Sequence, residues 1–491
     1  MKTKVILSLG LAAGLAPGAL SGQETNPAAA LQQLQGEFRQ LQQNFERMQQ
    51  QYRQQLEAIQ KRMDLLQQSQ TGGSSAAGMA PPAGALTPAA ASGANAAAAP
   101  LEPKTPWSPT APITLFGGQK SYMNVSFDAL MAAGGSTAKG GALDSLEFGG
   151  HDPKQNGFTA QNLEMVLDGA VDPYFRAQAN LVYQVDSAGE STFEVEEAYA
   201  ETTSLPGNFQ VKAGQYVTEF GRLNPTHPHT WTFADQPLVN GRLLGPDGLR
   251  SQGARVSWLT PTPFYSEVFL SVQNSQGQTA YSFRNPHPDG LLFGRPAVTR
   301  EVRSLGDLLL TPRYALSLDL TEAQTLLGGV SAAFGPNSSG QDTATQIYGA
   351  DLFWKWKPVT QHGGFPFVSW QTEAMLRHYE AGAYFNPGTG QHLPYETLVD
   401  YGLYSQVAWG FKKGWVAALR GDWVSGDPAA FAPDPNRDLR WRVSPNLTWF
   451  PTEFSKIRLQ YNYDQGRDLG VDHSIWLQFE FMLGAHAAHK F

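Results

Sequence analysis

Apolar and polar residues alternate along short stretches that recur from residue 113 to the end of the chain. The stretch FRAQANLVYQVD (175–186) places Phe, Ala, Leu, Tyr and Val on one face and Arg, Gln, Asn and Asp on the other. The stretches RWRVS (440–444), KIRLQYNYD (456–464) and SIWLQFEFML (474–483) repeat this arrangement. Successive side chains of a β-strand point to opposite faces, which gives a period of two. The pattern therefore predicts many strands with one apolar and one polar face.

Turn-forming segments separate these stretches, and short and longer connections alternate along the chain. Seven connections are short: 172–173, 206–208, 260–263, 321–324, 357–366, 412–414 and 450–453. Eight are mostly longer: about 132–157, 187–191, 221–249, 274–303, 336–343, 382–397, 425–438 and 464–473. Fifteen connections predict sixteen strands, with both chain ends on the side of the short turns. This rhythm is typical of an outer-membrane barrel. We therefore predict an all-β fold over 113–491, a transmembrane antiparallel β-barrel of about 16 strands.

Lipid would cover the apolar faces of such a barrel. The alternative is a soluble β-sandwich, but charged residues make up only 16% of the chain, too few to cover a soluble exterior. Six tryptophans lie near short turns, where they would form an aromatic girdle at the periplasmic interface: Trp258, Trp354, Trp356, Trp409, Trp415 and Trp449. The terminal Phe491 resembles the end signal of bacterial outer-membrane barrels.

Three segments with other patterns precede the barrel. Residues 1–22 combine Lys2 and Lys4 with an apolar stretch and small residues, which predicts a secretory signal peptide. Residues 23–68 are rich in Gln and carry apolar residues in a heptad repeat from Leu31 to Tyr52, which predicts an α-helical coiled coil in the periplasm. A single amphipathic helix lying on the barrel is the alternative. Residues 69–112 are rich in Ala and Pro and predict a linker.

The totals exclude several function classes. The chain lacks cysteine, so disulfides and thiolate metal sites are ruled out. Its net charge of −8 argues against nucleic acid as a partner. His227 and His229, and likewise His486 and His489, are candidate metal ligands, but a zinc site needs three or four convergent ligands, so we predict no metal site. The chain has neither a Gly-rich phosphate loop nor a G-x-S-x-G motif. We predict no catalytic residues, no enzyme activity and no cofactor.

The polar faces of sixteen strands would line a water channel. Basic residues are expected to outnumber acidic ones there. The candidate pore-lining residues are Arg176, Lys212, Arg255, Arg377, Arg420, Arg440, Arg442 and Arg458, with Glu164 and Glu373 among the acidic ones. Such a wall would favour counter-ions. Equally, the charges could be opposed pairs that only keep the pore wet.

Two long connections are candidates for a constriction of the channel. The first follows Phe220 and is stiffened by Pro225, Pro228, Pro237 and Pro246, so it could fold inward. The second, about 274–303, carries four arginines that could instead contact acidic lipopolysaccharide.

The barrel region resembles the phosphate-selective porin (O and P) family of Gram-negative outer membranes. The residues that carry the resemblance are FEVEEAYAE (193–201), VKAGQYVTEFGR (211–222) and GPDGLRSQGARVSW (245–258). The resemblance implies a sixteen-stranded homotrimer that passes small solutes by diffusion, with a loop folded into the pore. Phosphate-selective members line the pore with an arginine ladder and lysines, parts that Arg255, Arg377 and Arg420 could play.

The sequence thus favours a porin in the bacterial outer membrane, with its N-terminal segment in the periplasm. Small solutes would cross it passively, and these could include anions such as phosphate. Membrane lipid and lipopolysaccharide would surround it. The alternative is a structural anchor that ties the membrane to peptidoglycan through its coiled coil. An outer-membrane enzyme is a third hypothesis.

Overall fold

A computed structural model describes residues 112–117, 121–139, 143, 146–170, 172–185, 189–284, 291–467 and 470–484. The predicted signal peptide and coiled coil, the linker up to residue 111, and residues 485–491 lie outside the described residues. All described residues belong to one compact unit, Glu102–Phe491.

Within the described residues, sixteen strands form one closed antiparallel barrel, which confirms the predicted number and fold class. Each barrel strand pairs with the next along the chain, and the last returns to pair with the first, from Phe127 opposite Leu483 to Ser136 opposite Ser474. Closure leaves no lateral edge in this wall. The barrel strands are β2 (Tyr122–Ser136), β3 (Gly157–Ala170), β4 (Phe175–Val185), β5 (Ser191–Thr202), β6 (Phe209–Val217), β7 (Arg250–Leu259), β8 (Tyr265–Asn274), β11 (Leu308–Thr321), β12 (Gln324–Pro336), β13 (Ala344–Trp356), β14 (Phe367–Ala381), β17 (Glu396–Lys412), β18 (Trp415–Gly426), β19 (Arg440–Thr452), β20 (Ser455–Gly466) and β21 (Gly470–Leu483).

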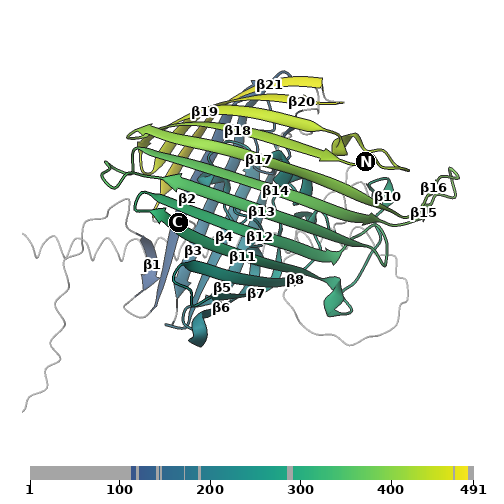
Figure 1. Ribbon diagram of the computed structural model, residues 1–491, viewed down its shortest axis with the longest axis horizontal. Helices are drawn as coiled ribbons and strands as arrows, with labels where there is room; N and C mark the ends of the chain where they lie inside the picture. The colour runs from purple at the N-terminus through teal and green to yellow at the C-terminus, as the bar shows by residue number, and fades with distance from the viewer. Residues whose placement is uncertain are drawn as a thin grey trace, which may run out of the picture. The chain divides into compact units, whose positions relative to one another are not determined.

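The strands lie side by side and tilted across the wall (Figure 1). Short and longer connections alternate as predicted, with one clear difference: β20 and β21 extend toward each other, so 467–469 replaces the expected connection 464–473. A further strand that the pattern did not predict, β1 (Ile113–Gly117), pairs with the start of β2. It occupies the edge of β2 that β21 leaves unpaired, because the register of β21 on β2 begins only at Phe127.

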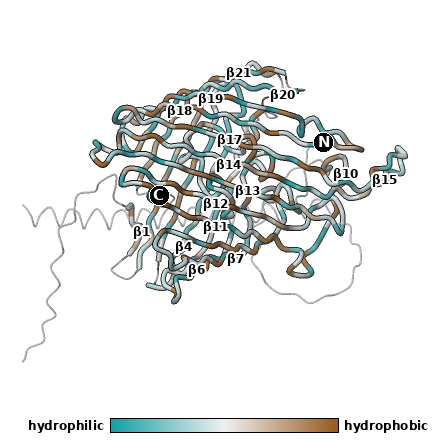
Figure 2. The backbone as a smooth tube through the Cα atoms, in the orientation of Figure 1, coloured by the Kyte–Doolittle hydropathy of each residue, from teal (hydrophilic) through white to brown (hydrophobic). Residues whose placement is uncertain are grey.

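Apolar and polar residues alternate along the strands (Figure 2), and the two faces of the wall differ in exposure as the period of two predicted. On β21, Ile475 and Phe481 are 53% and 54% exposed, whereas Ser474 and Gln478 on the other face are 2% and 1% exposed. Trp476 is the exception, because it faces inward and packs against Leu143 and Leu146. Apolar side chains left uncovered along a whole barrel suit a hydrocarbon solvent.

Aromatic rings gather near the short-turn end of the barrel. Trp258, Trp409 and Trp449 are exposed there, and Trp415 stacks on Trp449 with ring centroids 5.8 Å apart. Phe209 stacks on Trp258 at 6.0 Å. The placement fits the predicted girdle, in which amphipathic rings lie at the level of lipid headgroups.

None of the helices that the structure describes is long and apolar enough to cross a membrane. The connections hold small elements of their own. These elements are η1 (Pro206–Asn208), η2 (Pro228–Thr230), α3 (Leu238–Leu243), η3 (Gln278–Ala280), η4 (Leu305–Asp307) and η5 (Pro435–Arg437), and the short strands β9 (Leu291–Leu292), β10 (Arg295–Pro296), β15 (Tyr384–Phe385) and β16 (His392–Leu393).

Candidate functional site

The connection 218–249 between β6 and β7, hereafter the inward loop, folds into the barrel as the first of the two candidate constrictions. Its backbone is bound to strands far around the wall. The amide of Leu223 donates to Glu373 on β14 (2.8 Å), and that of Ala234 donates to Gln460 on β20 (2.8 Å). The amide of Leu238 donates to Asp422 on β18 (3.1 Å). The inward loop therefore spans the interior and is fastened on the side opposite its own strands.

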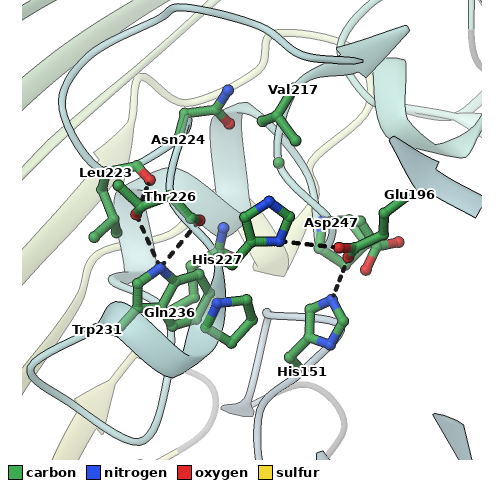
Figure 3. Close-up of a pocket in the computed structure, with 13 residues that line it drawn as sticks. His151, Glu196, Val217, Leu223, Asn224, Thr226, His227, Trp231, Gln236 and Asp247 are labelled. Atoms are coloured by element: carbon green, nitrogen blue, oxygen red, sulfur yellow. Dashed lines mark hydrogen bonds and ion pairs between the residues drawn. The ribbon is translucent and has the colours of Figure 1, made fainter. Parts of the chain in front are cut away.

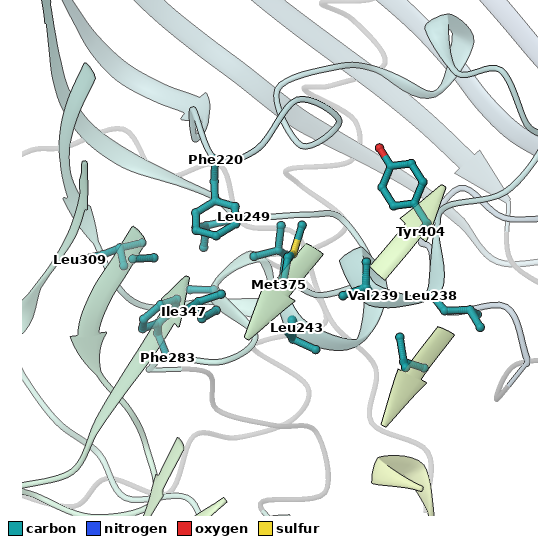
Figure 4. Close-up of a cluster of buried hydrophobic side chains, with 14 residues drawn as sticks. Phe220, Leu238, Val239, Leu243, Leu249, Phe283, Leu309, Ile347, Met375 and Tyr404 are labelled. Carbon is teal, nitrogen blue, oxygen red and sulfur yellow. The ribbon is translucent and has the colours of Figure 1, made fainter. Parts of the chain in front are cut away.

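An apolar cluster holds the second half of this loop against the wall (Figure 4). Phe220, Leu238, Val239 and Leu243 from the loop region are fully or almost fully buried. They pack with residues from six strands and from the rival connection 275–307: Leu309, Ala333, Ile347, Met375, Tyr404, Val424, Ala280 and Phe283. Burying a large apolar side chain contributes about 1.5–3 kcal/mol. The rival connection thus supports the inward loop from one side.

Local sequence explains the shape of the inward loop. Pro228 starts η2, and Pro237 precedes the first residue of α3, positions where a fixed φ suits a helix start. Gly221 has a φ of +61° and lies against Glu373, where a Cβ atom would collide with the carboxylate. The predicted stiffening by proline is thus realised as two short helical turns.

Asp235, near the middle of the inward loop, is the centre of a buried charge network. Its carboxylate accepts hydrogen bonds from Arg420 (2.7 Å), Arg442 (2.6 Å), Gln460 (2.9 Å) and Asn462 (2.8 Å). Burial alone would raise the pKa of Asp235, but Arg420 and Arg442 outweigh it and lower the pKa to about 2. Asp235 therefore stays ionised at neutral pH.

The connection between β2 and β3 reaches the same network. Glu147 accepts from Arg442 through both oxygens, at 3.0 and 2.9 Å. Asp464 accepts from Arg440 (2.7 Å) and from Arg442 (2.9 Å). Arg420, Arg440 and Arg442 are thus brought together, but each lies against carboxylates.

The other candidate residues lie elsewhere on the wall. Arg377 pairs with Asp400 at 2.6 Å, where Arg437 also binds. Arg458 donates to Thr448, Gln478 and the carbonyl of Trp231. Glu373 accepts from two amides of the inward loop and from the hydroxyl of Tyr404. These residues bind the loop or each other and do not form one continuous arginine ladder.

A separate group occupies the wall from β4 to β7. Arg176 pairs with Glu201, and Arg255 pairs with Glu219 at 2.5 Å. The Nζ atom of Lys212 lies 3.9 Å from Glu219 and 4.2 Å from the ring centroid of Tyr199.

Acidic side chains are at least as numerous as basic ones among the buried charged groups of the described residues. The expected basic excess on the inner face is therefore not met. The acidic residues lie mostly on the barrel strands themselves, where Asp128, Asp351 and Asp472 are buried and were not among the candidates. Other partners, such as Asp235 and Glu147, come from connections, whose residues cannot be assigned to a face by their period. Asp464 and Asp400 could have been found, because they follow the polar face of β20 and β17.

His227 and three glutamates form a second buried cluster on the inner face. The Nδ1 atom of His227 lies 3.2 Å from Glu196 and 3.5 Å from Glu164, and its Nε2 atom lies 3.1 Å from Glu197. Burial alone would lower the pKa of His227, but these carboxylates outweigh it and hold the pKa well above its usual value. Glu164 was among the predicted pore-lining residues, whereas Glu196 and His227 were not.

Sequence comparison gives one informative relative. No family model matches the chain. An uncharacterized protein of Aquifex aeolicus is 32% identical over 395 residues, which cover 73% of this chain and 77% of the relative. The chain belongs to the same family as this Aquifex protein.

Solved structures with a similar barrel share little sequence identity with this chain. The outer-membrane channel DcaP of Acinetobacter baumannii matches with a TM-score of 0.47 and 11% identity, over 75% of this chain and 99% of that one. An anion-selective porin from Comamonas acidovorans matches with a TM-score of 0.45 and 8% identity, over 74% of this chain and 100% of that one. Likenesses of this strength do not assign a function, and membership of the phosphate-selective porin family stays a prediction.

Proposed function

We propose that the protein is an outer-membrane channel through which small hydrophilic solutes diffuse passively. The observation that carries the proposal is a closed barrel with an apolar outer face, a charged inner face and a loop fastened across its interior. The outer face suits hydrocarbon and the inner face is polar, so the barrel would connect two aqueous compartments through a membrane. The inward loop would set the size limit for solutes.

The charge arrangement supports a channel with weak ion preference. A strong preference for phosphate requires cations without carboxylate partners, but Arg377, Arg420 and Arg442 each pair with at least one carboxylate. Charges paired at contact distance leave only a small net field for a passing ion. Phosphate is thus one of many solutes that would pass.

Planar-bilayer recording of the purified full-length chain tests the proposal. Stepwise currents with a reversal potential near zero in a salt gradient are expected. Steps in groups of three would support the predicted homotrimer. A correctly folded barrel that gives no current at any protein concentration would contradict the channel.

A shortened inward loop tests the constriction directly. Replacing residues 225–246 by a short Gly-Ser segment should increase the single-channel conductance several-fold. Replacing the exposed turn 386–391 between β15 and β16 is the matched control and should leave conductance unchanged. Equal conductance of both variants would exclude the inward loop as the narrowest part.

The structural anchor remains a second proposal that depends on residues 23–68, which lie outside the described residues. Deleting residues 23–112 tests it. Loss of cell-wall association with conductance retained would assign peptidoglycan binding to the coiled coil and solute passage to the barrel.

A further inference from the structure

The cluster around His227, hereafter the His227 cluster, joins three separate parts of the chain. Glu164 comes from β3, Glu196 and Glu197 come from β5, and His227 comes from the inward loop. All four side chains are more than nine-tenths buried. Figure 3 shows the carboxylate of Glu196 between the rings of His151 and His227.

A β-bulge aims both glutamates of β5 at this cluster. Pairing with β4 places Asn180 opposite Glu197 and the next residue, Leu181, opposite Val195, so Glu196 is the extra residue. Without the bulge, alternation would turn one of two consecutive glutamates toward the lipid. With it, Glu196 and Glu197 both face inward. Bulges are enriched beside functional sites, where they redirect a side chain.

The two distances from His227 to Glu196 and Glu164 match those between neighbouring ligands of a tetrahedral metal centre. Bonds of about 2.0–2.2 Å at a tetrahedral angle separate neighbouring ligand atoms by about 3.3–3.5 Å. The Nδ1 atom of His227 lies 3.2 Å from Glu196 Oε2 and 3.5 Å from Glu164 Oε1. The three ligand atoms all lie within 4.8 Å of one another.

Neighbouring side chains are placed as an outer shell for such a centre. Glu197 lies 3.1 Å from Nε2 of His227 and can accept its N–H, so that a metal ion would replace only the proton on Nδ1 between the two carboxylates. His151 lies 3.0 Å from the second oxygen of Glu196. His229 lies 3.4 Å from the second oxygen of Glu164. The remaining oxygen of each ligand carboxylate is thus directed by a histidine.

An adjoining cavity offers room for a fourth ligand. It has a volume of about 30 Å³ and is lined by His151, Glu196, His227, Asn224 and Asp247, among others. A space of this size can hold one water molecule, and His151, Asn224 and Asp247 offer it polar groups.

We propose that Glu164, Glu196 and His227 form a binding site for a divalent transition metal of the zinc type, with a water molecule as fourth ligand. One imidazole and two carboxylates suit such an ion. Bound metal would tie the inward loop to β3 and β5, in addition to its attachment to β18 and β20. The requirement for three convergent ligands, which argued against a metal at His227 and His229, is met by glutamates 31 and 63 residues earlier in the chain. The site does not depend on whether the barrel conducts.

Zinc titration of the full-length chain, purified without a histidine tag and stripped with a chelator, tests the site. We expect saturable binding of one Zn²⁺ per chain, measured by competition with a fluorescent zinc chelator. His227→Ala and Glu196→Gln should each weaken binding at least 100-fold. Glu197→Gln should weaken it about 10–100-fold without changing the stoichiometry, because Glu197 only positions the ring. His392→Ala, in the exposed strand β16, is the control and should bind like the wild type.

Absorption spectroscopy at the zinc edge keeps the proposal testable if the variants fail to fold. One imidazole and oxygen ligands at about 2.0–2.1 Å are expected in the wild-type protein. Three or more imidazoles would place the metal elsewhere and overturn the assignment. So would the absence of binding at one ion per chain, or folded His227→Ala and Glu196→Gln variants that bind like the wild type.

Discussion

The barrel wall and the inward loop are stabilised in different ways. In the wall, each strand is bonded to its neighbours in chain order, as β14 is to β17 from Phe367 opposite Gly410 to Ala381 opposite Glu396. The inward loop has no such ladder to a neighbour along the chain. It is held by individual side chains such as Glu373, Asp422 and Gln460, which come from strands more than 140 residues later.

This difference predicts that the wall and the inward loop respond differently to amino-acid substitution. The contribution of a wall residue to stability depends on the face on which it lies, so a substitution of similar polarity is tolerated. A residue that fastens the inward loop matters through its specific partners, so removing one partner leaves others buried without a counter-charge.

The largest effect is expected for Arg442→Ala. The substitution leaves Glu147, Asp235 and Asp464 with fewer cationic partners, and breaking a buried ion-pair network costs about 3–5 kcal/mol. The free energy of unfolding in urea, measured in lipid vesicles, checks it. Val443→Ala, the next residue on the exposed face, is the control and should cost about 1 kcal/mol. Similar losses for the two variants would contradict the distinction between wall and loop.

A charge on the outer face is expected to have the next largest effect. Leu419→Arg places a cation on the lipid-facing side of β18 and should lower the free energy of unfolding in vesicles by about 2–4 kcal/mol. Leu419→Met keeps the face apolar and should cost less than about 1.5 kcal/mol. If Arg is tolerated as well as Met, lipid does not contact this face.

Leu243→Ala tests the apolar cluster of the inward loop. Leu243 is fully buried, and large-to-small substitutions in such positions cost about 2–5 kcal/mol. We expect the lower part of this range, about 2–3 kcal/mol, because the loop can move to fill space. Leu305→Ala, at an exposed position of the connection 275–307, should stay within about 0.5 kcal/mol. Hydrogen exchange should increase in residues 218–249 for Leu243→Ala alone.

The attachment of the inward loop should also depend on acid pH. Burial would raise the pKa of Asp235, but Arg420 and Arg442 lower it from 3.8 to about 2, despite the nearby carboxylates of Asp422 and Glu147. A lowered carboxyl pKa adds stability above the unfolded value near 4, and this contribution disappears as the pH falls through about 2. The difference between the folded and unfolded pKa values of Asp235 corresponds to about 2 kcal/mol of folding stability. The stability difference between wild type and Asp235→Asn should therefore shrink between pH 4 and pH 2, and a constant difference would contradict it.

The same distinction explains what could be predicted from the sequence. The sixteen strands followed from alternation, because the alternating apolar and polar residues of each strand assign its outer and inner faces. The same alternation assigned Ile475 and Phe481 to the outer face and Gln478 to the inner face. The packing of the apolar Trp476 on the polar face could not be predicted, because its contacts Leu143 and Leu146 come from a connection.

The candidate site was only partly predictable. The proline-rich loop could be named as a constriction, and Glu164, Arg420 and Arg442 could be placed on the inner face. Their partners could not, because Asp235 and His227 lie in a loop without periodicity. The consecutive Glu196 and Glu197 break strict alternation, and they were not interpreted as a bulge. A pair of like charges within an otherwise alternating strand is the signal that could have revealed it.

The smallest effect is expected at the girdle, where a wall contact between two side chains can be measured alone. Trp415 and Trp449 lie opposite each other on β18 and β19 and stack with an interplanar angle of 16°. Aromatic pairs contribute about 0.5–1.5 kcal/mol beyond the burial of each ring. A double-mutant cycle with Trp415→Leu and Trp449→Leu should give a coupling energy in this range. Trp409, elsewhere in the girdle, supplies the control cycle with Trp449 and should give a coupling near zero. Coupling above about 2 kcal/mol would mean that this wall contact, like those of the inward loop, depends on one specific partner.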